Sequence, residues 1–309
     1  MKPYEEFVQE IRQSYACLEK TLANENHSEQ EALDTFKGIV SVCVPSVVEL
    51  MANKNWRKLW NKYNQRLQDL LSRPYIRNRS FYFIDFLSIL CDARQSKAEM
   101  IQTYNLFEAF ENTVQELFDI IHSNRNLEMK FQHKLEAKIV EVVTAGPSLA
   151  DESNNSSFKN FVNEIAFFYH IAKHLQIGLV DIEKNLPNGK SVDFHLVWDN
   201  SEYFVDTITI QNTLNQEELN RFIEGKINDK FFQKTQNLQD KYILDKFRVQ
   251  AIIEFEDNRL LDYSPNLPND KCFPPMISLM ERTDEKGWVI TLEQLPLKDD
   301  VKNKLINNK

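Results

Sequence analysis

Three acidic side chains in the second half of the sequence stand where the surrounding pattern predicts apolar neighbours. Glu164 lies in a helical run beside Phe161 and Phe168, and Asp193 and Asp206 lie in two strand-like runs. A carboxylate in such a setting lowers stability by several kcal/mol unless it is paired, protonated or bound to a metal. The three acids are therefore the first candidates for a functional site.

A hairpin predicted between the two strand-like runs brings two of these acids together. The segment 199–202 reads D-N-S-E, which predicts a turn with Asn200 and Ser201 at its tip. This pairing sets His195 opposite Asp206 and makes Asp193 and Asp206 diagonal neighbours on one sheet face. Clustered carboxylates repel each other unless a cation binds between them, and oxygen-only ligands favour Mg²⁺ or Mn²⁺ over zinc. Such an ion polarises a phosphate and lowers the pKa of a bound water, which is the chemistry of phosphodiester hydrolysis.

The order of these elements carries a resemblance. A helix with Glu164 precedes a strand, then V-D-F at 192–194, a hairpin, V-D-T-I at 205–208, a lysine-bearing helix and a further strand. Over about residues 156–257 this resembles the PD-(D/E)XK nuclease superfamily, which has the restriction-endonuclease-like fold. The resemblance implies that Glu164, Asp193 and Asp206 are catalytic and hold the metal. Val192 stands where the family's proline would be, and position 206 carries aspartate in place of glutamate.

The main departure from the family pattern is Ile208, which stands where the family has a lysine that positions the attacking water. An isoleucine cannot orient or stabilise a hydroxide. Some members of the superfamily supply the lysine from the following helix, where Lys226, Lys230 and Lys234 repeat at i+4 in this sequence. The resemblance implies Lys230 as the substitute, with Lys234 second. The alternative for all three lysines is a solvated helix face.

A basic window in the first half is the other candidate binding feature. Residues 54–79 contain eight basic side chains against a single acid, Asp69, in a chain whose net charge is −9. Four of them recur at i+4 on one helix face, opposite an apolar face with Trp56 and Trp60: Lys54, Lys58, Lys62 and Arg66. This face is either solvated or a phosphate-binding ridge for nucleic acid.

Composition excludes several other classes of protein. The 309 residues contain only six glycines, none spaced for a dinucleotide-binding or P-loop turn. The four cysteines form no C-x-x-C pair, which suits a reducing interior. The stretch 38–48 is far too short to span a membrane, and no signal peptide is recognisable. We therefore expect a cytoplasmic protein without membrane association.

Hydrophobic periodicity divides the chain into two parts. Apolar residues recur at helical spacing from about residue 4 to 145, and turn-forming residues cluster between Thr144 and Ser157. Beyond them we expect a helix at 158–175, strands at 177–183, 190–198 and 203–211, a helix at 215–241 and a strand at 247–256. A proline-rich loop at 264–275 should precede a short helix and a last strand at 288–292. The predicted domains are an all-helical domain, 1–147, and a restriction-endonuclease-like α/β domain with a mixed central sheet, 156–309.

Three functions follow from these patterns. The first is a metal-dependent nuclease that grips DNA or RNA with its helical half and cuts it with the other, a layout suited to bacterial restriction or defence. The second is an inactive nuclease-fold scaffold that binds a protein or nucleic-acid partner, which Ile208 favours. The third is an all-helical interaction protein with an unrelated α/β domain. The choice between DNA and RNA stays open, as does assembly into homo-oligomers.

Overall fold

The computed structural model describes most of the chain. The described residues are 1–72, 83–91, 96–123, 129–144, 158–173, 178–211, 216–255, 260–261, 263, 267, 270–284 and 287–307. The structural statements below concern these residues. The predicted linker between 147 and 156 lies outside them.

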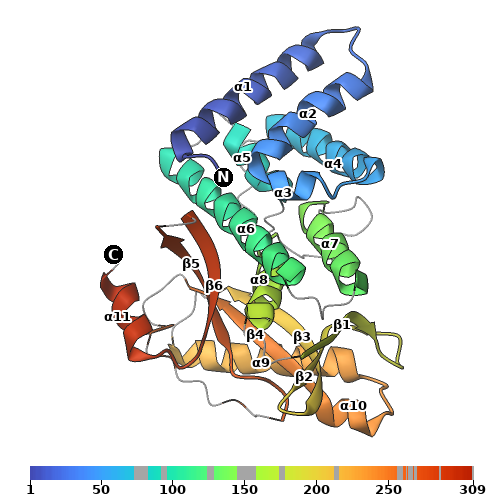
Figure 1. Cartoon of the computed structure of the whole chain (residues 1–309), viewed down its shortest axis with the longest axis vertical. Helices are drawn as coiled ribbons and strands as arrows, with labels where there is room; N and C mark the ends of the chain where they lie inside the picture. Colours follow the sequence, from blue (N-terminus) through green and yellow to red (C-terminus); the bar gives the residue numbers. More distant parts are fainter. Residues whose placement is uncertain are drawn as a thin grey trace. The chain divides into compact units, whose positions relative to one another are not determined.

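The first part of the chain is helical in all its described elements, as its periodicity predicts (Figure 1). Its helices are α1 (Tyr4–Ala23), α2 (Glu29–Cys43), α3 (Pro45–Val48), α4 (Asn53–Ser72), α5 (Phe83–Cys91), α6 (Lys97–Ser123) and α7 (Met129–Thr144). The start of α2 shows how local sequence fixes a boundary. Ser28 and Glu31 form a capping box, in which each side chain bonds the other residue's backbone N–H. Among the described residues, no helix is both long enough and apolar enough to cross a membrane.

Aromatic side chains form the centre of the helical part. Phe158, the first residue of α8 (Phe158–Lys173), is fully buried and packs against rings from α5 and α6: Phe83, Phe86, Phe107 and Phe110. The ring centroids lie 5.4 to 6.1 Å apart, within the range of favourable edge-to-face and tilted contacts. Phe107 and Phe110 of α6 are fully buried and belong to the core.

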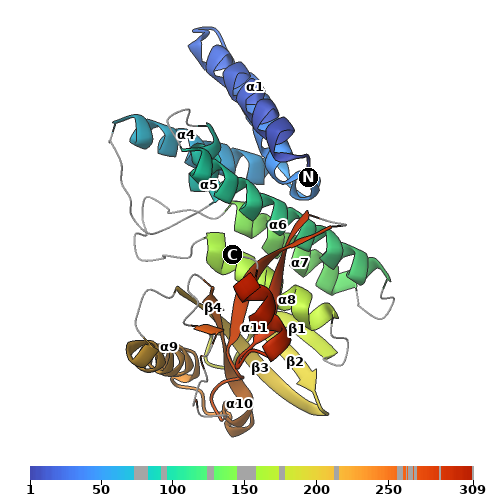
Figure 2. The same ribbon diagram turned by 90° about the vertical axis from the view of Figure 1, so that its left-hand side faces the viewer.

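The second part contains a mixed sheet. Its elements are β1 (Gly178–Asn185), β2 (Ser191–Trp198), β3 (Ser201–Gln211), α9 (Gln216–Thr235), α10 (Lys241–Lys246), β4 (Phe247–Glu254), β5 (Met276–Thr283), β6 (Gly287–Gln294) and α11 (Asp299–Asn307). The strand order is β1-β2-β3-β4-β5-β6. The pairs β1–β2 and β2–β3 are antiparallel, whereas β3–β4 and β4–β5 are parallel. The predicted mixed sheet is therefore present, flanked by helices (Figure 2).

Two helices position side chains on opposite faces of the sheet at β2 and β3. Phe167 and Phe168 of α8 pack on Phe194 of β2, with ring centroids 5.3 and 6.1 Å away. Lysines of α9 instead reach Asp206, which lies on the other face because Phe194 pairs with Val205. The face on which α9 lies is thus the one that holds Asp206.

The segment before the last strand differs from our prediction. We expected a short helix there, but residues 276–283 form strand β5. Ile277 and Leu279 are buried while Met280 is exposed, so burial alternates with the period of a strand. The parallel pairing of β5 with the fully buried Ile252 and Ile253 of β4 explains why a strand is preferred.

The chain forms two compact units. One comprises Met1–Ile165 and Met280–Val289, and the other comprises Ala166–Leu279 and Ile290–Lys309. The division falls inside α8. The first unit also includes the last residues of β5, from Met280, and the first residues of β6, to Val289. The chain therefore passes from one unit to the other three times, whereas a single linker would be crossed once.

Candidate functional site

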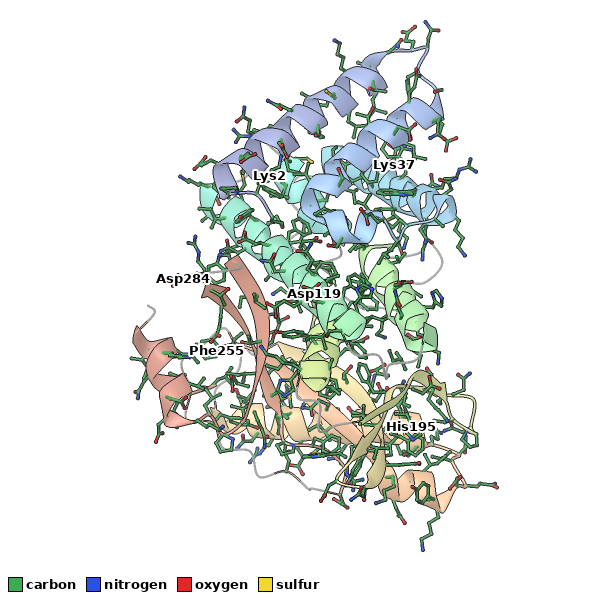
Figure 3. All side chains as sticks on the ribbon, viewed as in Figure 1. Lys2, Lys37, Asp119, His195, Phe255 and Asp284 are labelled. Carbon is green, nitrogen blue, oxygen red and sulfur yellow. The ribbon has the colours of Figure 1, made fainter. Side chains whose placement is uncertain are left out.

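The β2–β3 hairpin differs from our prediction by a shift of two residues. Asp199 and Asn200 form the turn, with φ values of 50° and 57°, and Trp198 pairs with Ser201. His195 therefore pairs with Phe204, not with Asp206, and its ring stacks on that of Phe204 at 4.6 Å. Because side chains alternate with a period of two, this shift keeps the paired residues, 194–198 and 201–205, on their predicted faces. His195 is labelled on β2 in Figure 3.

Asp193 lies where the pairing of β2 with β3 stops. The last pair of that ladder is Phe194 with Val205. Beyond it, the Asp193 carboxylate accepts hydrogen bonds from both the backbone N–H and the hydroxyl of Thr207, each 2.7 Å long. The side chain thus replaces a missing strand-to-strand hydrogen bond and is held in a fixed orientation.

Asp206 lies at the centre of a cluster of charges. Its side chain is fully buried, and its two carboxylate oxygens form ion pairs with two lysines of α9. The Nζ atom of Lys230 is 3.1 Å from Oδ1, and that of Lys234 is 2.6 Å from Oδ2. The structure therefore brings together Asp206 and both lysines that the resemblance implied as substitutes. We call Asp193, Asp206, Lys230 and Lys234 the Asp–Lys cluster.

Lys234 is held from two further directions. Its ammonium group donates a hydrogen bond to the carbonyl of Ser191 at 2.6 Å. The side-chain amide of Asn188, in the β1–β2 turn, donates to the carbonyls of Lys234 and Gln236 at 2.8 and 3.0 Å. These bonds satisfy carbonyl groups that the end of α9 would otherwise leave unpaired. The turn before β2 and the end of α9 are thereby joined beside the cluster.

Burial governs the ionisation of Asp206. Loss of hydration, and then the nearby charge of Asp193, raise the pKa of Asp206 from its ordinary value of 3.8 to about 6, although both lysines act in the opposite direction. The lysines thus offset only part of the unfavourable energy of a buried charge. A carboxylate in this state is a typical feature of functional sites.

The cluster suits a divalent cation in its donor chemistry. Asp193 and Asp206 supply carboxylate oxygens, the ligands that Mg²⁺ and Mn²⁺ prefer, and their mutual repulsion is the kind that a cation relieves. Lys230 and Lys234 contact the same Asp206 oxygens, so a cation would compete with their ammonium groups. Within the described residues, no group of three or more His, Cys, Asp or Glu side chains is placed to hold a metal ion.

Glu164, the third predicted acid, belongs to the first unit. Its carboxylate forms an ion pair of 2.7 Å with Lys138 of α7, whose side chain is 7% exposed. The structure thus assigns Glu164 a partner within the helical unit. Its predicted share in a metal site stays a prediction.

Ile208 and Lys226 have surroundings unlike those of the cluster. Ile208, at the family's lysine position, is partly buried and packs against the apolar core beneath the sheet. Lys226 is exposed, and its ammonium group lies 5.3 Å from the ring centre of Phe222. Of the three α9 lysines, only Lys226 fits the alternative of a solvated face.

The basic face of α4 is only partly a free surface. Lys54 and Lys58 are exposed, whereas Lys62 is partly buried and donates a hydrogen bond of 2.8 Å to the carbonyl of Thr144, the last residue of α7. Burial, followed by the like charge of Lys58, lowers the pKa of Lys62 to about 8. The ammonium group of Lys62 thus binds another helix of the same chain. The side chain of Arg66 lies outside the described residues.

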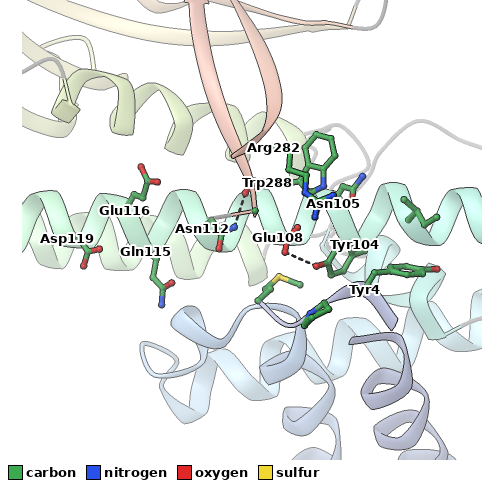
Figure 4. A pocket seen from close by; sticks show the side chains of 14 residues that line it. Tyr4, Tyr104, Asn105, Glu108, Asn112, Gln115, Glu116, Asp119, Arg282 and Trp288 are labelled. Atoms are coloured by element: carbon green, nitrogen blue, oxygen red, sulfur yellow. Dashed lines mark hydrogen bonds between the residues drawn. The ribbon is translucent and has the colours of Figure 1, made fainter. Parts of the chain in front are cut away.

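A groove of about 810 Å³ lies in the first unit, along α6 (Figure 4). Tyr104 donates a hydrogen bond to Glu108 at 2.7 Å, and Asn112 donates to the carbonyl of Trp288 at 2.9 Å. A Cβ atom on Gly287, whose φ is +80°, would lie 3.1 Å from the Glu108 carboxylate. Glycine therefore permits the start of β6 to lie directly against α6. None of the predicted site residues lines this groove.

Sequence reasoning missed the groups that orient the cluster. Thr207, Ser191 and Asn188 hold Asp193 and Lys234 through backbone and side-chain hydrogen bonds. Thr207 gives no signal in the sequence, because threonine is common in strands. Ser191 accepts the hydrogen bond of Lys234 through its backbone carbonyl, and a pattern of side chains could not indicate this contact.

Comparison of the chain with protein-family models, with curated proteins and with solved structures found no match.

Proposed function

We propose that this chain is a metal-dependent, nuclease-like protein that hydrolyses phosphodiester bonds in nucleic acid. The observation that carries the proposal is the Asp–Lys cluster, with two carboxylates beside the end of a strand ladder and two ammonium groups from the next helix. The element order around it supports the resemblance. A helix, an antiparallel three-strand meander, a helix and a parallel strand follow each other in both.

The residues have distinct tasks in this proposal. Asp193 and Asp206 would hold Mg²⁺ or Mn²⁺, which when bound supplies polarisation of the phosphate and a more acidic water. Thr207 fixes the Asp193 carboxylate, and Lys234 ties Asp206 to the backbone of β2. Lys230, beside the other oxygen of Asp206, stabilises negative charge on the phosphate. The exposed Lys54 and Lys58 on α4 are candidate contacts to the phosphate backbone.

Two observations favour a second function, an inactive nuclease-fold scaffold. Ile208 contributes to the core where the family has its lysine, and both oxygens of Asp206 are already engaged by ammonium groups. A scaffold of this kind would keep the binding of nucleic acid or of a protein partner and lose the chemistry.

Cleavage assays separate the two functions. We expect labelled single- or double-stranded DNA or RNA to be cut by the full chain in Mg²⁺ or Mn²⁺, and not in EDTA. Asp193→Ala should abolish cutting, and Lys230→Ala should slow it by about a hundredfold or more, as loss of a charge-stabilising group does. Lys226→Ala is the matched control, because it removes an ammonium group from the same helix but outside the cluster.

Two results would contradict the nuclease proposal. One is the absence of cleavage at high protein concentration, with binding of nucleic acid retained, which supports the scaffold. The other is cleavage that Asp193→Ala leaves intact, which would assign the activity to a contaminant or to another site.

A further inference from the structure

An aromatic cluster lies at the turn end of the β2–β3 hairpin. It consists of Trp198, Tyr203 and Phe273, whose ring centroids lie 5.2 to 6.5 Å from one another. Phe273 joins the two hairpin residues because its segment pairs with β4, where the N–H of Phe273 donates to the carbonyl of Val249. Two segments distant in sequence, the hairpin and the segment around Phe273, thus contribute to one surface, which we call the hairpin aromatic cluster.

The hairpin aromatic cluster is partly exposed to solvent, unlike the buried side chains on the same face of the sheet. Phe194, four residues before Trp198 on β2, is fully buried beneath rings of α8. Trp198 keeps 44% of its surface exposed, the highest fraction for any tryptophan of the chain. The exposed part of this indole presents a flat face on which a planar ligand can stack.

Two cations accompany the aromatic rings. The ammonium group of Lys246 lies 5.4 Å from the ring centre of Tyr203, and the guanidinium group of Arg248 lies 5.6 Å from it. Arg248 also donates hydrogen bonds to the carbonyls of Asp245 and Phe247, so its position is fixed in advance. Stacking surfaces flanked by fixed cations are the combination by which proteins bind unpaired nucleotides.

Acidic groups nearby limit the electrostatic contribution. Asp199 lies in the turn. Glu202 lies on β3, with its Oε2 atom 3.4 Å from Nε2 of His195. A ligand bound here would therefore gain more from stacking than from neutralisation of its charge. This balance favours single strands, whose bases are accessible, over duplexes, whose bases are stacked inside.

We propose that the hairpin aromatic cluster binds single-stranded nucleic acid, with bases stacked on Trp198 and phosphates beside Lys246 and Arg248. The choice of nucleic acid as ligand rests on the proposed function. Trp198 and Asp193 belong to the same strand, five residues or about 17 Å apart, and Trp198 lies on the sheet face opposite Asp206. The substrate class is accordingly a single strand or a duplex with unpaired ends.

Binding is measured separately from cleavage, by fluorescence anisotropy of labelled dT15 and U15 with the full chain in EDTA. We expect Trp198→Ala to weaken binding by about tenfold or more, as loss of a stacking aromatic does. Trp198→Phe should restore most of the affinity. Phe232→Ala is the matched control, since Phe232 is 64% exposed on α9, away from the cluster. A duplex of equal length should bind more weakly than either single strand.

The salt dependence gives a second, independent measurement. Two phosphate contacts on a single strand predict that log Kd rises with log salt concentration with a slope of about 1.4. Arg248→Met should lower this slope by about 0.7. Circular dichroism spectra of all variants check that their overall secondary structure matches that of the wild type.

The outcomes distinguish this inference from the proposed function. Trp198-dependent binding without cleavage supports the aromatic cluster and contradicts the nuclease proposal. Asp193-dependent cleavage with unchanged binding in Trp198→Ala overturns the aromatic cluster alone. The inference is also overturned if the wild type does not bind dT15 or U15 at about 100 μM protein, the weak end of non-specific affinities, or if Phe232→Ala weakens binding as much as Trp198→Ala.

Discussion

Burial of the Asp206 carboxyl group makes its charged form unfavourable, and the two lysines reduce that penalty only in part. The pKa of Asp206 is raised from 3.8 to about 6. Between these values the folded chain binds more protons at this group than the unfolded chain does. The contribution of Asp206 to stability is therefore complete at low pH and is lost as pH rises through this window.

This ionisation predicts a difference between the wild type and Asp206→Asn, which resembles the protonated acid. As pH rises from about 4 to 7, the free energy of unfolding of the variant should increase relative to that of the wild type by up to about 3 kcal/mol. Urea unfolding in EDTA at several pH values measures it. Parallel pH profiles for the two proteins would show that the lysines fully compensate the buried charge.

At the scale of elements, the β2–β3 turn sets the geometry of the site. Asp199 and Asn200 both have positive φ, as a two-residue type I′ turn requires. This turn fixes the pairing of β2 with β3 from Trp198 with Ser201 to Phe194 with Val205, and that pairing places Asp206 on the sheet face opposite Val205. The position of the Asp–Lys cluster thus depends on two residues at the far end of the hairpin.

Substitution at Asn200 tests this dependence. Asn200→Ala should lower the free energy of unfolding by about 1 kcal/mol, because alanine adopts a left-handed conformation unfavourably. Asn200→Gly should leave stability equal or higher, since Asp-Gly is among the preferred pairs for this turn. Thermal unfolding followed by circular dichroism compares the three proteins. Equal stability of the alanine and glycine variants would show that backbone strain at residue 200 is unimportant.

At the scale of the whole molecule, the division of the chain into units runs through α8. The first unit extends to Ile165, and Phe158 fills the centre of its aromatic core. A boundary placed after residue 147 removes this ring from the helices that surround it. The unit that contains these helices extends past the turn-forming residues into α8.

Fragments test the extent of the helical unit. Fragment 1–173 should be more stable than fragment 1–147 by roughly 3 kcal/mol, the usual effect of losing a buried phenylalanine. Phe158→Ala in fragment 1–173 is the matched control and should remove most of this difference. Urea unfolding and the binding of a hydrophobic dye report the result. If both fragments unfold at the same urea concentration, the core does not need Phe158.

The sequence by itself determined the classes of the elements and the faces of their side chains. Helical periodicity predicted the first part, and alternation predicted β2 and β3 and the faces of the residues that pair between them. The two-residue shift of the hairpin left these faces unchanged, because the side-chain period of a strand is two. Local pattern is reliable where it reflects the geometry of one element.

Tertiary structure alone decided which charged groups meet. The lysines at 226, 230 and 234 have equivalent spacing, yet only the last two contact Asp206, because α9 packs with that part of its surface against the sheet. Likewise Lys62 bonds to the end of α7, although its spacing placed it with the exposed Lys54 and Lys58. Contacts between distant segments depend on the packing of whole elements, which the spacing of residues within one element does not encode.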